Sequence, residues 1–188
     1  MRTLRVTDKL TENHPPNSDM SESNLSIVDV KNQWLSQHVD VKYPTPESLA
    51  GRKLYLNDAK TKHCKPLEAV ADAQTMYHQD EIYLVDFHRL TVMFALLQSQ
   101  RWEKQEEQEL VVEYLTQIIY SEPCELYVGF KQGEPSAAAI VTQIDGQILL
   151  SDLAVKHQEE TEIQSFTKGL LNKLDVNPNE YSDIYLEF

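Results

Sequence analysis

Glycine is scarce in this chain of 188 residues, which contains five glycines and two cysteines. The motifs G-x-x-x-x-G-K, G-x-S-x-G and H-E-x-x-H are absent, so the sequence shows no P-loop, no serine-hydrolase elbow and no zinc-protease helix. The two cysteines, Cys64 and Cys124, stand sixty residues apart without a C-x-x-C pair. We therefore expect reduced thiols in a cytosolic protein and no metal site.

Long apolar runs are also missing. No run approaches the roughly 18 residues of a membrane helix. The N-terminal stretch MRTLRVTDKLTENHPP has two early arginines but lacks the apolar region of a secretory signal. Residues 1–24 are polar and contain Pro15 and Pro16, which predicts a flexible N-terminal segment. We expect a cytoplasmic protein.

Positive charge is short, because the formal net charge is −13. Residues 1–79 hold ten Lys or Arg against ten Asp or Glu, whereas residues 80–188 hold seven against twenty. This asymmetry predicts two regions with different surfaces. An acidic surface disfavours nucleic acid, since phosphate neutralisation needs Lys and Arg. It is compatible either with simple solubility or with a basic protein partner.

The first half of the chain has weak patterns, and we interpret residues 25–80 as an accessory α/β region. The apolar residues between 25 and 38 fit a strand or a short helix, and Arg52–Asn57 alternates like a strand. From Pro66 onward, Leu67, Val70, Ala71 and Gln74 follow helical spacing, with the proline in the first turn. Two prolines in the stretch YPTPES at 43–48 favour a turn or an extended piece.

The second half, residues 81–188, gives clearer patterns. A strand is predicted at 81–85, and Asp86 resembles the N-cap of a helix that carries Phe87, Leu90, Phe94 and Leu97. A second helix should run to about residue 120. Three strands, at 124–131, 136–143 and 147–155, are joined by short turns, and a helix at about 160–174 and a strand at 183–188 follow. The predicted fold class is α+β, with a mixed, mostly antiparallel sheet flanked by helices.

This order of elements resembles the N-acetyltransferase superfamily called GNAT, whose core runs β-α-α-β-β-β-α-β. The hairpin LYVGFKQGEPSAAAIVT is similar to the family's second and third strands, and QILLSDLAV is similar to its fourth. The resemblance covers residues 81–188, and rests on element order and texture. It implies a fold that, in active members, binds acetyl-CoA beside the fourth strand, here at Leu153, Ala154 and Val155.

The chain departs from the family where a glycine-containing loop should hold the coenzyme A pyrophosphate. Residues 156–163 read KHQEETEI, without glycine, and Gly169 lies too far along the helix to serve. Glu159, Glu160 and Glu162 place like charge at the helix end that favours anions. Each close phosphate–carboxylate pair would be repelled by about 1 kcal/mol even in water. The family's elements beyond its fifth strand have no counterpart in these 188 residues.

Asp152, near the end of the predicted fourth strand, is a weak candidate for a catalytic base, because family members often place one there. A carboxylate against apolar walls acquires a raised pKa suited to removing a proton from an amine. The alternative is an exposed or hydrogen-bonded strand aspartate. His157, the His63–Cys64 pair and the Asp86-x-His88 pair fit caps, solvent contacts or an idle thiol better than catalysis.

Trp34, Tyr43, Tyr55 and Tyr77 make the first half aromatic. They either line a pocket or interface or, as we expect, pack this half onto the sheet. A sheet that ended at its fifth strand would leave an open edge. We expect strands from residues 25–57, or a second copy in a homodimer, to cover it.

Two functional hypotheses follow. The first is a non-catalytic, acidic binding or regulatory protein with a degenerate acyltransferase-like fold, a protein partner and no cofactor. The second is a divergent acyl-CoA-dependent N-acyltransferase acting on a small amine or a basic protein, with acetyl-CoA as cofactor and Asp152 as base.

Overall fold

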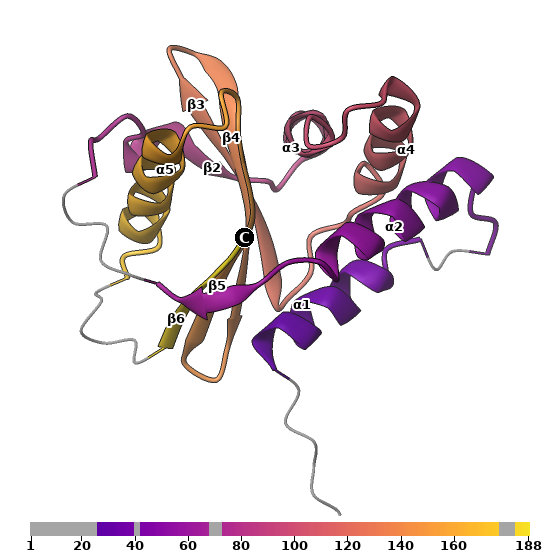
Figure 1. Ribbon diagram of the computed structural model, residues 1–188, viewed down its shortest axis with the longest axis horizontal. Coiled ribbons are helices and arrows are strands. Elements are labelled where there is room, and N and C mark those ends of the chain that lie inside the picture. The colour runs from indigo at the N-terminus through magenta and orange to yellow at the C-terminus, as the bar shows by residue number, and fades with distance from the viewer. Residues whose placement is uncertain (1–25, 40–41, 68–72, 177–182) are drawn as a thin grey trace, which may run out of the picture.

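The computed structural model describes residues 26–39, 42–67, 73–176 and 183–188 (Figure 1). The predicted flexible segment 1–24 lies outside the described residues. The helices are α1 (Ile27–Ser36), α2 (Pro46–Ala59), α3 (His88–Ser99), α4 (Gln105–Leu115) and α5 (Glu160–Lys173), with a 3-10 turn η1 (Gln79–Glu81). The strands are β1 (Cys64–Pro66), β2 (Ile82–Leu84), β3 (Cys124–Lys131), β4 (Glu134–Ile144), β5 (Gln147–Val155) and β6 (Asp183–Glu187).

These strands form one sheet in the order β1-β6-β5-β4-β3-β2. The pairs are antiparallel except β5 with β6, which run parallel. The chain therefore has an α+β fold with a mixed, mostly antiparallel sheet, as the sequence predicts. The element order strand, helix, helix, three strands, helix, strand from β2 to β6 is also the predicted one.

Helices cover both faces of the sheet, with α5 on one side and α1 to α4 on the other (Figure 1). Alternation along β4 explains this arrangement, because successive side chains of a strand point to opposite faces. Ala138 and Ile140 pack into the core under α1 to α4, whereas Ala137, Ala139 and Val141 pack into the core under α5. Both faces of the long central strand are thus apolar and buried.

The stretch 25–38, which fits either a strand or a helix by sequence, is the helix α1. A capping box fixes its start: the Ser26 side chain accepts from the Asp29 N–H, and the Asp29 carboxylate accepts from the Ser26 N–H. These contacts satisfy N–H groups that a helix end leaves free. One face of the helix is buried and consists of Ile27, Trp34, Leu35 and, among these apolar residues, Lys31.

Two predictions in the first half are wrong. Arg52–Asn57 lies inside α2, because Thr45 caps the helix and Pro46 occupies its first turn, where a missing N–H costs little. The stretch YPTPES at 43–48 accordingly includes the start of that helix. Pro66 belongs to β1 and begins no helix; of the predicted helical residues, 68–72 lie outside the described residues and 73–76 form no regular element.

Other boundaries differ from the prediction. The N-cap of α3 is Phe87 rather than Asp86, and α4 ends at Leu115 rather than near residue 120. The open edge of β6 is covered by β1, whose Cys64 lies opposite Glu187, and not by residues 25–57. Within the described part of the chain, no helix is both long and apolar enough to cross a membrane.

Gly51 allows α2 and α4 to approach closely, since a Cβ at this position would collide with the carbonyl group of Leu110. Alanine would add about 1 kcal/mol of helix propensity, yet we expect Gly51→Ala to lower the free energy of unfolding by about 2–3 kcal/mol, because the backbone must move. Urea unfolding measures the change. Ala50→Gly at the adjacent exposed position is the control and should cost only about 1 kcal/mol. A stabilised Gly51→Ala variant would contradict the contact.

Candidate functional site

The site begins where β5 leaves β6. The last parallel pair is Leu150 with Leu186, so the two strands separate beyond that point. On its other side β5 carries a bulge, because Ala138 pairs with Ala154 and Ile140 with Ser151, which leaves two β5 residues opposite one of β4. Asp152, the first bulge residue, has φ of 52°, in the left-handed region. Bulges re-aim side chains and end strand pairing.

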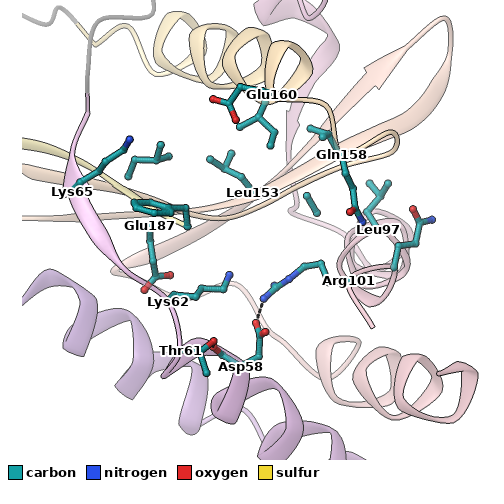
Figure 2. A pocket seen from close by; sticks show the side chains of 16 residues that line it. Asp58, Thr61, Lys62, Lys65, Leu97, Arg101, Leu153, Gln158, Glu160 and Glu187 are labelled. Carbon is teal, nitrogen blue, oxygen red and sulfur yellow. Dashed lines mark hydrogen bonds and ion pairs between the residues drawn. The ribbon is translucent and has the colours of Figure 1, made fainter. Parts of the chain in front are cut away.

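The separated strands open into a cavity of about 690 Å³ (Figure 2). Leu153, Ala154 and Val155 of β5 line it, together with residues from the end of α2, from α3, from β6 and from the first turn of α5. Its wall combines apolar side chains, among them Leu97, Ile163 and Leu186, with charged ones. Lys62, Arg101 and Asp58 lie on the side of α2, and Glu160 lies on the side of α5 (Figure 2).

A strand edge faces this cavity. The Lys156 N–H donates to the Ser136 carbonyl oxygen at 2.9 Å, so this pair faces inward between β4 and β5. In an antiparallel ladder the next residue, Val155, must turn its N–H and C=O away from β4, toward the cavity. The Val155 carbonyl oxygen accepts from the Gln158 N–H at 3.2 Å, so the Val155 N–H is the group of this residue that remains on the cavity side.

Asp152 lies under the cavity, fully buried, and is held by side chains from α1, from α2 and from the turns that follow α2 and α3. Its Oδ1 accepts from the Tyr55 hydroxyl at 2.7 Å, from Arg101 at 3.1 Å and from Lys62 at 3.2 Å. Its Oδ2 lies 3.5 Å from the Lys31 ammonium. Arg101 is itself paired with Asp58. Asp152 is thus the hydrogen-bonded strand aspartate of the alternative interpretation.

The charge state of Asp152 follows from these partners. Burial by itself raises the pKa of this carboxyl, but Lys62, Lys31 and Arg101 hold it well below its ordinary value. The raised pKa expected of a base in an apolar wall is therefore wrong. A strongly acidic carboxyl is a weak proton acceptor, and this one has no exposed surface.

Glu187 shares the Lys31 ammonium with Asp152, and it lines the cavity although its side chain is almost wholly buried. Burial and the neighbouring Asp152 raise the pKa of Glu187, and the Lys31 ammonium only partly offsets them. Lys31 is fully buried, which lowers its pKa, but the two carboxylates outweigh this effect and raise it above the ordinary value. Asp152 and Glu187 thus share the Lys31 ammonium, yet the pKa of Asp152 is lowered and the pKa of Glu187 is raised.

The three glutamates at the start of α5 have different surroundings, and only some of them are near the cavity. Glu159 is the exposed N-cap, and Glu160 lines the cavity. Glu162 is buried beneath the helix, where it accepts from the Tyr77 hydroxyl at 2.8 Å and lies 3.5 Å from the Lys131 ammonium. Of the three carboxylates expected to repel the phosphates of coenzyme A, only those of Glu159 and Glu160 therefore remain at the start of the helix. Gly169 packs against Ile82 and Tyr77, and plays no part in the cavity.

Other residues considered from sequence do not meet in this site. His157 is exposed in the turn before α5, and Asp86 and His88 are exposed at the start of α3. Cys64 is exposed on β1, where partial loss of solvent around its thiol and the nearby Glu187 carboxylate raise the pKa of that thiol. In the described part of the chain, no group of three His, Cys, Asp or Glu side chains is arranged to hold a metal.

Three of the four aromatic residues of the first half pack inside the protein, as expected, and one does not. Trp34, Tyr55 and Tyr77 are buried, whereas Tyr43 is 81% exposed. Sequence reasoning missed the partners of Asp152, and one signal was available. Lys31 occupies the apolar stripe of α1, four residues after Ile27 and three before Trp34. A lysine at such a position needs a buried carboxylate.

No family model matches the chain, and no curated protein matches it. Among solved structures, one match is the crystal structure of a conserved protein of unknown function from Bacteroides thetaiotaomicron VPI-5482. The identity is 10%, the TM-score is 0.32, and the alignment covers 82% of this chain. The chain spans 47% of the length of that protein, and a likeness at this level carries no argument about function.

We expect Asp152→Asn to destabilise the protein strongly, because it leaves Lys31, Lys62 and Arg101 buried without their common carboxylate. Removing one partner of a buried charge cluster costs about 3–5 kcal/mol. Urea unfolding of Asp152→Asn measures this loss. Asp145→Asn is a matched control, since Asp145 also has a left-handed backbone, with φ of 50°, but is exposed in a turn. The control should stay within about 0.5 kcal/mol of the wild type. Equal losses would contradict a role for the charge.

Glu187→Gln should behave differently with pH. The pKa of Glu187 is higher in the folded than in the unfolded chain, so its contribution to stability is greatest below the unfolded pKa and is lost as pH rises. The wild type should therefore gain stability relative to Glu187→Gln as the pH falls from 7 to about 4.5. Urea unfolding of both proteins across this range gives the difference. A stability difference between the two proteins that does not change with pH, or that decreases as the pH falls, would contradict a raised pKa for Glu187.

Proposed function

We propose that the protein is a non-catalytic binding or regulatory domain with a degenerate acyltransferase-like fold. The order of elements over residues 81–188 supports the likeness to the N-acetyltransferase superfamily. The observation that carries the non-catalytic role is the state of Asp152. This candidate base is buried, ionised and bound by Lys31, Lys62 and Arg101, so it has neither access to a substrate amine nor the basicity to deprotonate one.

The cavity between β5 and β6 is the binding site in this proposal. Its wall supplies the Val155 N–H and an apolar lining at Leu153, Ala154 and Leu186. An extended chain that carries amide groups fits this combination, because its carbonyl oxygen pairs with the free strand edge while its apolar groups contact the wall. An extended segment of a protein partner meets these requirements without a cofactor.

A divergent N-acyltransferase is the second candidate, and a specific observation supports it. The cavity beside Leu153, Ala154 and Val155 is open, with room for a pantetheine arm. Glu162 is turned away from the phosphate position, which removes part of the expected repulsion. In this candidate acetyl-CoA is the cofactor, and the acceptor is a small amine or a basic protein.

Calorimetry with coenzyme A and acetyl-CoA, at low and at moderate salt, separates the two candidates. We expect no binding up to about millimolar ligand, because Glu159 and Glu160 remain at the helix end where the phosphates would lie. Glu159→Ser combined with Glu160→Ser is the companion variant. Binding by the variant alone would show that charge closes an otherwise competent cavity. Micromolar binding by the wild type would overturn the proposal and favour the acyltransferase.

The same proposal predicts where a neutral extended chain binds. A capped tetrapeptide VTVT should shift the Val155 amide signal in nuclear magnetic resonance spectra, with a millimolar dissociation constant. Ile163→Trp, which fills the cavity from α5, should abolish the shift, whereas Ile119→Trp, at a position 78% exposed, should not. An unmoved Val155 signal in the wild type would contradict an extended ligand in this cavity.

A further inference from the structure

The two edges of the sheet differ in how they are protected. At one edge, β1 carries Pro66, which has no N–H to offer, and the exposed Lys65. Proline and lysine are devices by which natural proteins prevent edge strands from pairing with other chains. At the opposite edge, β2 has neither residue within Ile82–Leu84. β2 is short, but the chain continues from it in contact with β3, because the Val85 N–H donates to the Leu126 carbonyl oxygen at 2.8 Å.

The backbone of this edge has groups available to a partner. Since Val85 faces β3, the alternation of an antiparallel ladder turns Leu84 and Asp86 outward. The Ile82 N–H is already used, because it donates to the Gln79 carbonyl oxygen. The outward donor and acceptor of Leu84 are therefore the centre of the edge.

Large aromatic side chains lie beside these groups. Tyr83 is 48% exposed and contacts the Phe130 ring edge-on, at 5.4 Å between centroids. Phe87 is 54% exposed and occupies the N-cap of α3 without any side-chain hydrogen bond to the helix. Phenylalanine is a poor N-cap, where serine, aspartate or asparagine would stabilise the helix. A local rule that is broken to expose an aromatic ring indicates a functional position.

The charge around the edge selects the occupant. Residues 78–88 contain Asp80, Glu81 and Asp86, and the exposed Arg89 that follows is the nearest cation along the chain. Lys131, at the end of neighbouring β3, pairs with Glu162. A second copy of the chain would bring the same three carboxylates, Asp80, Glu81 and Asp86, to the shared edge, and like charges disfavour that arrangement. A strand with basic residues at both ends is complementary.

We propose that the β2 edge, defined by Leu84, Tyr83, Phe87, Asp80 and Asp86, is a docking site for an extended basic segment of a partner protein. The segment adds as a further strand outside β2, pairs with the outward backbone of Leu84, and contacts Tyr83 and Phe87. Lysine or arginine residues at its two ends lie near Asp86 and Asp80. This surface belongs to β2 and is separate from the cavity on β5.

A fluorescein-labelled, capped heptapeptide KTVTVTK is a suitable probe, and ETVTVTE is its matched control. In fluorescence anisotropy the wild-type protein should bind KTVTVTK at least about tenfold more tightly than ETVTVTE. The variant Asp80→Lys with Asp86→Lys should weaken binding of KTVTVTK about tenfold and improve binding of ETVTVTE. The variant Glu103→Lys with Glu109→Lys, at exposed positions near and on α4, carries the same net charge and should change binding less than about twofold.

A second variant keeps the test independent of folding. Phe87→Ser supplies the missing cap of α3, so it should raise the midpoint of urea unfolding while it weakens binding of KTVTVTK. Nuclear magnetic resonance spectra should show the peptide shifting the Leu84 amide and leaving Val155 unmoved. Equal losses for both double variants would indicate unspecific charge attraction and would overturn the proposal. A Leu84 amide signal that changes with protein concentration in the absence of peptide would show that a second copy of the chain occupies this edge. That result would also overturn the proposal.

Discussion

The buried carboxylate of Asp152 is the interaction on which the arrangement of this protein depends. It collects Lys31 from α1, Tyr55 from α2, Lys62 from the turn after α2 and Arg101 from the turn after α3. The N-terminal helices are thereby attached to the central sheet by charge as well as by apolar packing. Removal of Asp152 would leave Lys31 with Glu187 and Arg101 with Asp58, but these two cations and Lys62 would lose their shared carboxylate, and such losses are costly.

The same cluster limits the chemistry of the cavity above it. A general base must exchange protons near the working pH and must reach its substrate. Asp152 does neither, since three cations keep it ionised and no part of it is exposed. The left-handed backbone at Asp152 places the carboxylate beneath the sheet bulge, among the cations. The bulge that turns the end of β5 toward the cavity therefore also places Asp152, the acidic residue of this strand, in the buried cluster beneath it.

Sequence patterns predict the second half of the fold well, and the reason is physical. Alternation in β3, β4 and β5 reports which side chains meet the helices on each face, so strand positions can be read locally. The strand predicted at Arg52–Asn57 is wrong because alternation over six residues is a weaker signal than the helix start that precedes it. That start consists of the Thr45 cap and Pro46 in the first turn of α2. The ion cluster could not be predicted, because its members lie far apart in sequence. Only the lysine in the apolar stripe of α1 hinted at a buried partner.

The two edges of the sheet differ in how they are protected against pairing with other chains. β1 ends the sheet at a proline and a lysine, whereas β2 ends it with outward backbone groups, an exposed tyrosine and an N-cap phenylalanine that contributes no cap to α3. Phe87 is 54% exposed, so only part of this residue packs against the chain. In our proposal, this exposed ring is one of the groups that contact the partner segment. The acidic residues that flank β2 are the reason that the proposed segment is basic.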